Sequence, residues 1–129
     1  MSARVDAATA VGVALAGAAG SLCRWLVAVW MAKWPRWPWG TLAVNVVGAL
    51  LIGGVVAALA ARGLADSRTR IVITSGFMGG FTTFSAFAFE TVAMLERRQV
   101  GSAALYVIVT VLAGIAAAWL GLAGVRALR

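Results

Sequence analysis

The fold of this protein is decided by the stretch GFMGGFTTFSAF, residues 76–87. The stretch lies in the middle of an apolar run, residues 71–95, which is long enough to cross the roughly 30 Å hydrocarbon layer of a bilayer. Its two adjacent glycines and two threonines suit a helix interior poorly, because glycine costs about 1 kcal/mol relative to alanine there. We therefore expect a membrane-spanning helix that breaks at residues 79–83.

Three further apolar runs accompany this segment, at residues 5–32, 39–61 and 101–125. The chain has 129 residues, of which 63% are hydrophobic and 12% charged, and its mean hydropathy is +0.97. So few charges cannot coat a soluble globule of this size. The sequence therefore predicts an all-α membrane protein with four transmembrane helices, the third of them broken at its middle, in a single domain over residues 1–129.

The composition also excludes several classes of function. The chain has no histidine, a single cysteine, Cys23, and four carboxylates, so we expect neither a metal hydrolase, nor a disulfide framework, nor a histidine-dependent nucleophilic enzyme. The net charge of +7 comes from 11 basic residues that gather at the ends of the apolar runs. That pattern is typical of contact with lipid headgroups and does not indicate nucleic acid. We expect a protein that is not an enzyme.

Basic residues are divided almost evenly between the two faces of the membrane. The face that holds both termini has six, and the opposite face has four. The six are Arg4, Arg62, Arg68, Arg70, Arg126 and Arg129, and the four are Lys33, Arg36, Arg97 and Arg98. So small a bias lets the chain insert in both orientations, and we hypothesise an antiparallel, dual-topology homodimer. The alternative is a single orientation with cytoplasmic termini.

Small residues at every fourth position mark packed faces on three of the spans, and each stripe carries polar side chains. The stripes are Gly12-Ala16-Gly20 leading to Arg24, Asn45 leading to Ala49-Gly53-Ala57, and Tyr106-Thr110 leading to Gly114-Ala118. Taken singly, the neutral polar residues are explained as interhelical hydrogen bonds. Arg24 is different, because a guanidinium inside a span normally faces a partner or a water-filled cavity. A structural ion pair between Arg24 and Glu90 is the alternative.

The break provides groups that suit two kinds of ion. Carbonyls freed at a helix break inside a membrane form an oxygen cage for a hard cation such as sodium. Downstream of the break, Phe84 and Phe87 lie on one helical face beside the Ser85 hydroxyl. Aromatic rings have positive edges, so the rings, the hydroxyls and the Asn45 amide together suit a small anion. For an isolated phenylalanine pair, ordinary packing is the alternative.

These motifs resemble the Fluc (CrcB) family of fluoride channels, which are small four-span proteins assembled as antiparallel dimers. The resemblance covers nearly the whole chain and rests on GSLCRW at 20–25, GTLAVN at 40–45 with Gly48, and residues 79–87. It implies passive, selective fluoride export from the cytoplasm across a bacterial plasma (inner) membrane, with two pores per dimer. Ala86 and Gly114 depart from the family pattern, where threonine and serine occur, and we expect altered conductance.

The resemblance also implies roles for single residues. The positions that line or approach the fluoride path are Asn45, Phe84, Phe87, Ser85, Thr110, Tyr106 and Thr41. Within this set the phenylalanines supply rings and Asn45 supplies an amide donor. Arg24 would lie at an aqueous vestibule. Gly79 and Thr82 look like the residues whose main-chain carbonyls, from both subunits, hold a structural sodium ion (Na+) at the dimer centre.

A proton-coupled exporter of the small multidrug-resistance type is the chief alternative. Such exporters share four spans, this length and dual topology, but they carry a carboxylate in the first span. Here the first span contains Arg24, and the deep carboxylate, Glu90, lies in the third. A non-transporting assembly protein would not need a broken span. The sequence therefore favours the fluoride channel.

Overall fold

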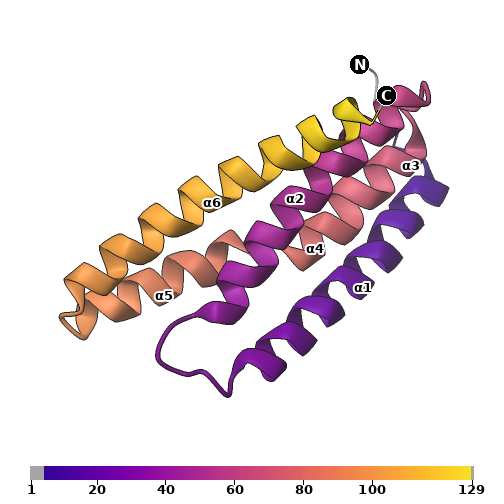
Figure 1. The fold of residues 1–129 in the computed structure, drawn as a ribbon. Coiled ribbons are helices and arrows are strands. Elements are labelled where there is room, and N and C mark those ends of the chain that lie inside the picture. The colour runs from indigo at the N-terminus through magenta and orange to yellow at the C-terminus, as the bar shows by residue number, and fades with distance from the viewer. Residues whose placement is uncertain (1–4, 129) are drawn as a thin grey trace.

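The computed structural model describes residues 5–128, and within that range the chain is helical and contains no strand (Figure 1). The elements are α1 (Ala7–Met31), α2 (Trp39–Ala61), α3 (Arg68–Ile71), η1 (Val72–Met78), α4 (Gly79–Phe81), α5 (Phe84–Glu96) and α6 (Val100–Ala127). Four segments are long and apolar enough to cross a membrane, namely α1, α2, Arg68–Glu96 and α6. The prediction of an all-helical fold with four such segments is therefore confirmed.

The segments pack mainly as two pairs. α2 packs chiefly against α6, and α1 packs chiefly against η1 and α4. Figure 1 shows α6 and α1 at opposite sides of the bundle, with α2 and the third segment between them. The start of α1 and the end of α6 lie at the same end of the bundle, as an even number of spans requires.

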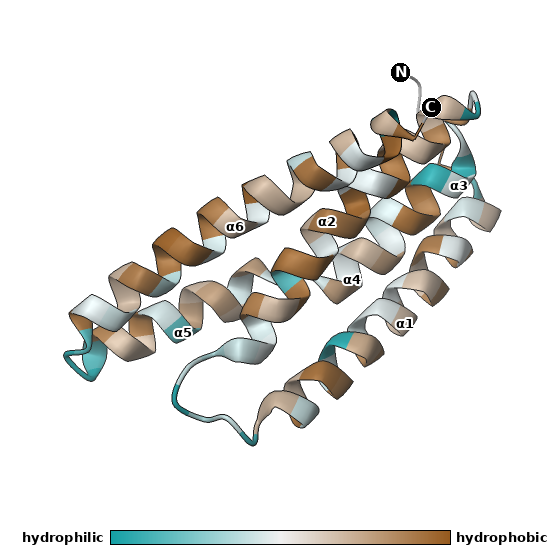
Figure 2. Cartoon of the chain, in the orientation of Figure 1, coloured by the Kyte–Doolittle hydropathy of each residue, from teal (hydrophilic) through white to brown (hydrophobic). Residues whose placement is uncertain are grey.

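Polar residues lie mainly at the two ends of the bundle. Figure 2 shows hydrophilic residues in the connections between helices and mostly hydrophobic residues along the helices themselves. At the end that holds the start of α1, Asp6 accepts hydrogen bonds from the hydroxyl and the main-chain N–H of Thr9, which lower the pKa of the Asp6 carboxyl. Asp6 also pairs with Arg68 at 3.3 Å. Arg4 and Arg129, which entered the charge comparison, lie outside the described residues.

Small residues allow the backbones of both helix pairs to approach closely. A Cβ atom added at Gly20 of α1 would overlap the Phe77 carbonyl oxygen of η1. A Cβ atom at Gly53 of α2 would overlap the Ala118 carbonyl oxygen of α6. Both glycines belong to the stripes found in the sequence, and the structure places both at helix contacts. Close backbone approach of this kind is how membrane helices associate without a hydrophobic driving force between them.

The third membrane-length segment changes conformation several times along its length. It continues from α3 into the π-helix η1, which the sequence analysis did not predict. Gly79 is helical, with φ −61° and ψ −36°, whereas Thr82 and Thr83 are extended, with φ/ψ of −87°/159° and −150°/118°. The non-helical stretch is therefore shorter than the expected residues 79–83. The short helix α4, which contains both glycines, packs against α1, and Gly80 lies directly against the α1 backbone.

Candidate functional site

Asn45 holds the extended residues in place from the neighbouring helix α2. Its Nδ2 donates to the Thr83 carbonyl at 2.9 Å, and the Thr83 main-chain N–H donates to Asn45 Oδ1 at 2.8 Å. The Thr83 hydroxyl accepts from the Ala86 N–H at 3.2 Å and so begins α5, and it lies 3.3 Å from the Ser85 hydroxyl. Because an amide nitrogen carries two N–H groups, Asn45 keeps one donor beyond its bond to Thr83.

Arg24 reaches the same region from α1. Its Nε donates to the Gly80 carbonyl at 2.9 Å, which leaves the terminal nitrogens of the guanidinium for other partners. Within residues 5–128, the ion pair that the structure forms is Arg68 with Asp6. The Arg24–Glu90 ion pair considered from the sequence is therefore not present, because Glu90 has other partners.

Glu90 is bound by two hydroxyl groups from two other helices. The Thr41 hydroxyl of α2 donates to Oε1 at 2.6 Å, and the Tyr106 hydroxyl of α6 donates to Oε2 at 2.6 Å. The family resemblance predicts Thr41 and Tyr106 at the site but does not predict Glu90 there. One signal pointed to it, since Glu90 is a carboxylate in the interior of an apolar run, and such residues are functional candidates by default.

Aromatic rings form a continuous column from the break to this carboxylate. Phe84 lies 5.7 Å from Phe87, Phe87 lies 5.2 Å from Tyr106, and Tyr106 lies 5.4 Å from Trp37, measured between ring centroids. The last two contacts are edge-on. The Tyr106 side chain is 0% exposed and Phe87 is 9% exposed, but Phe84 is 78% exposed. The column therefore begins at an exposed ring and runs into the interior.

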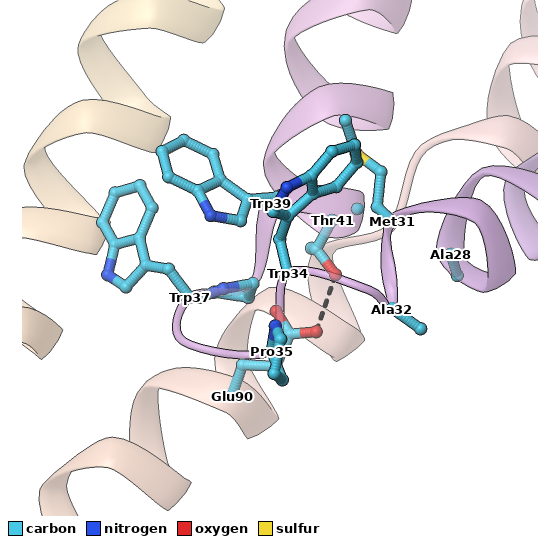
Figure 3. Close-up of a pocket in the computed structure, with 11 residues that line it drawn as sticks. Ala28, Met31, Ala32, Trp34, Pro35, Trp37, Trp39, Thr41 and Glu90 are labelled. Atoms are coloured by element: carbon cyan, nitrogen blue, oxygen red, sulfur yellow. Dashed lines mark hydrogen bonds between the residues drawn. The ribbon is translucent and has the colours of Figure 1, made fainter.

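Two clefts meet at Glu90. One, of about 180 Å³, is lined by the tryptophan-rich loop between α1 and α2 together with Thr41 and Glu90. Figure 3 shows the Thr41–Glu90 hydrogen bond beside the loop that carries Trp34, Pro35 and Trp37. The second cleft, of about 240 Å³, is lined by Arg36, Arg97, Gln99 and several apolar residues, and it also includes Glu90. The carboxylate thus lies where a basic cleft approaches the aromatic column.

Thr110 lies one helical turn beyond Tyr106 on the same face of α6. Its side chain is 9% exposed, and its hydroxyl has no hydrogen-bond partner among the described residues. A buried hydroxyl without a partner is rare in folded proteins and costs about 1–3 kcal/mol. The position is therefore suited to a ligand or a water molecule that can accept its proton.

Main-chain oxygens at the break are suited to a cation. In a continued helix the Thr83 N–H would pair with the Gly79 carbonyl, but it donates to Asn45. Gly79 is exposed, and Thr82 is partly exposed, with its hydroxyl bonded to the Met78 carbonyl at 2.9 Å. Residues 5–128 contain no cluster of three His, Cys, Asp or Glu side chains that could hold a metal. The oxygens available to a hard cation here are main-chain carbonyls.

The structure brings most of the predicted residues into two neighbouring groups. Asn45 and Ser85 lie at the break with Thr83, and Arg24 lies there with Gly80. Phe87 joins this group to Thr41 and Tyr106 through the ring contacts and Glu90. The two groups together form one polar and aromatic track.

Comparison with known proteins shows which family this chain matches. Residues 11–122 match the family model described as CrcB-like protein, Camphor Resistance (CrcB). A relative from Agrobacterium fabrum is 45% identical over 113 residues, which cover 86% of this chain and 90% of the relative. One from Rhizobium leguminosarum is 43% identical over 118 residues, covering 90% and 94%. One from Caulobacter vibrioides is 46% identical over 113 residues, covering 85% and 89%. Each relative is named "Fluoride-specific ion channel FluC".

Proposed function

The chain belongs to the CrcB family, and on that basis we propose that it is a fluoride channel and not an enzyme. Its four apolar helices and its bacterial relatives make it an integral membrane protein of the bacterial plasma (inner) membrane. The observation that carries the proposal is the track that joins the break to Glu90, because it combines ring edges with hydrogen-bond donors. A small anion needs both when it leaves water.

The donors along this track define how fluoride would move. The free N–H of Asn45 and the Ser85 hydroxyl lie at the exposed end of the ring column, and the buried, unpartnered Thr110 hydroxyl lies one helical turn after Tyr106 on α6. The edges of Phe84 and Phe87 face the ion between these donors. Further along, Tyr106 and Thr41 direct their hydroxyls to Glu90, which reduces the repulsion between the carboxylate and a passing anion. Arg24 raises the anion concentration in the vestibule.

The channel is proposed to be passive and selective. Fluoride is smaller than chloride, so a narrow path whose donors are spaced for fluoride rejects the larger ion. Export then follows the fluoride gradient out of the cytoplasm. The Ala86 and Gly114 positions leave the track with fewer hydroxyls, which we expect to alter conductance while selectivity is kept.

A second copy of the chain is proposed to cover the break. Phe84, Ser85 and Gly79 are exposed on the single chain, although they lie in the middle of a membrane-length segment. Irregular backbone at membrane depth is tolerated only where it is buried in protein or lines a cavity. An antiparallel homodimer buries this surface against its own copy, and the near-even charge distribution supports dual topology. Each dimer would then hold two pores.

The main-chain oxygens at the break fit a sodium ion at the centre of such a dimer. Gly79 and Thr82 would hold it through their carbonyls, from both copies. When bound, sodium supplies a positive charge that links the oxygens of the two chains. Asn45 prepares the site because it takes the N–H that would otherwise pair with Gly79.

Fluoride efflux from liposomes tests the proposed function. Purified protein is reconstituted into liposomes loaded with potassium fluoride, and release is followed with a fluoride electrode, with chloride release as the matched control. We expect rapid fluoride release without chloride release and without a proton gradient. No fluoride release from folded protein would reject the channel. Proton-dependent transport of a cationic drug would support the small multidrug-resistance alternative instead.

A further inference from the structure

Side chains from two helices donate to two of the main-chain carbonyls at the break, those of Gly80 and Thr83. Arg24 donates to the carbonyl of Gly80, which directly follows Gly79. Asn45 donates to the carbonyl of Thr83, which directly follows Thr82. The Met78 carbonyl, which precedes Gly79, accepts from the N–H and the hydroxyl of Thr82 at 3.0 and 2.9 Å. Each residue proposed to bind sodium is therefore followed by a carbonyl that a side chain has already engaged.

We propose that Arg24 is a positioning residue of the cation site, because its hydrogen bond occupies the Gly80 carbonyl and thereby limits the oxygens that the cation can reach. The inference rests on the sodium site of the proposed function. A carbonyl cage distinguishes cations by the number and the placement of its oxygens. If the Gly80 carbonyl were free, it could join the cage and favour a larger ion. Arg24 would then determine the preference for Na+ over K+.

The packing of α1 makes this hydrogen bond a fixed feature of the fold. A Cβ atom at Gly80 would overlap the Gly17 carbonyl oxygen and would lie 3.0 Å from the Ser21 N–H. The backbones of α1 and α4 are therefore in direct contact at Gly17 and Ser21, within two turns before Arg24 along α1. A hydrogen bond from a guanidinium is also roughly twice as strong as one between neutral groups. The Gly80 carbonyl is thus held from a rigid neighbouring helix by a strong donor.

Arg24 also affects cation binding through its charge, and this electrostatic effect must be separated from its effect on the Gly80 carbonyl. The guanidinium is a positive charge near the cation, so removing it would strengthen the binding of every monovalent cation. Such repulsion acts equally on Na+ and K+, because both carry one charge. A change in the cage changes the ratio of the two affinities. The ratio is therefore the quantity that tests the proposal.

The experiment measures cation-dependent stability and does not require transport. Purified full-length protein in detergent is unfolded by heat in choline buffers that contain increasing Na+ or K+, with tryptophan fluorescence as the signal. The concentration of each cation that gives half of its stabilisation is compared among the wild type, Arg24→Met, Arg24→Lys and Arg62→Met. Methionine reaches about as far as the Nε atom of arginine but has no donor, and lysine keeps the charge with a displaced donor. Arg62 directly follows the last residue of α2, and Arg62→Met controls for the loss of one positive charge.

We expect the wild type and Arg62→Met to share one Na+ preference over K+. Arg24→Met should lower that preference at least about tenfold, and Arg24→Lys about threefold, in keeping with the loss or weakening of a charge-assisted bond. An unchanged ratio in Arg24→Met would overturn the proposal, including the case in which both cations bind more tightly. If Arg24→Met does not fold, a ratio in Arg24→Lys equal to that of the wild type overturns it.

The Na+ response in detergent and the fluoride release from liposomes test the role of Arg24 and the channel function separately. A wild type whose stability does not respond to Na+ would remove the cation site, and with it the role of Arg24, even if liposomes release fluoride. Liposomes that release no fluoride, together with a normal Na+ response, would reject the channel and leave the positioning role of Arg24 supported.

Discussion

Tyr106 donates its hydroxyl proton to Oε2 of Glu90 across 2.6 Å, at a position where the tyrosine side chain has no exposed surface. The other oxygen of the carboxylate accepts from Thr41, also at 2.6 Å. One carboxylate of α5 therefore joins α2 and α6. A carboxylate inside a membrane span needs such donors, because leaving a buried charge without partners is strongly unfavourable.

Removing the Tyr106 hydroxyl tests the cluster that Glu90 forms with Tyr106 and Thr41. Tyr106→Phe keeps the ring contacts with Phe87 and Trp37 and removes the bond to Glu90. We expect a stability loss of about 1–3 kcal/mol and slower fluoride efflux, because the carboxylate is then less neutralised beside the anion path. Unfolding in detergent and liposome efflux measure the two effects.

Thr41→Val is the companion variant, because it removes the second donor to Glu90. The double variant should not equal the sum of the two single losses, since both donors share one carboxylate. Wild-type efflux in both single variants would limit the cluster to a structural role.

Phe84 and Phe87 should respond differently to substitution by isoleucine. Both changes remove a ring edge from the proposed path, so both should reduce fluoride efflux. Phe87→Ile should destabilise the fold of each chain by about 1–2 kcal/mol, because Phe87 is 9% exposed and packs on Tyr106. Phe84 is 78% exposed on the single chain, so Phe84→Ile should act on the proposed contact between two copies and leave the packing within each chain unchanged. Efflux and unfolding are compared in the same preparations. Wild-type efflux in both variants would contradict the ring path.

Asn45→Asp should impair both the fold of the break and fluoride transport. The variant loses the Nδ2 donor to the Thr83 carbonyl and places an ionised oxygen opposite that carbonyl. It also presents a negative charge to the anion. We expect a stability loss of about 1–3 kcal/mol, measured by unfolding in detergent, and greatly reduced fluoride efflux from liposomes. Normal efflux in Asn45→Asp would mean that Asn45 serves only as an interhelical hydrogen bond.

Gly20→Ala tests the contact between α1 and η1. The added methyl group would overlap the Phe77 carbonyl oxygen, so the helices must separate, and the protein should lose stability. Gly124→Ala is the matched control, because a Cβ atom there has no heavy atom of the described residues within 4 Å. Alanine is the better helix former, so the control should be neutral or stabilised by up to about 1 kcal/mol. Equal effects of the two changes, measured by thermal unfolding, would argue against close packing at Gly20.

The number of membrane-length helices could be predicted because the length and hydropathy of an apolar run are local properties of the chain. The weakness of the third helix was predictable for the same reason, since glycine and threonine disfavour helix interiors wherever they occur. The extent of the interruption could not be predicted, because Gly79 and Gly80 are helical in α4, a turn that packs against the distant helix α1. The π-helix from Val72 to Met78 had no signal in the residue pattern.

The residue pattern was sufficient to identify an all-helical membrane protein, and its motifs were sufficient to indicate the family. The pairing of the polar residues became visible only in the packing of the helices. Arg24 bonds a carbonyl 56 residues away, and Glu90 bonds a hydroxyl 49 residues away, whereas the Arg24–Glu90 pair that the sequence allowed does not form. The physical reason is that the formation of a membrane helix depends on residues that are close together in the sequence. The hydrogen-bond partner of a side chain depends on which helix faces pack together.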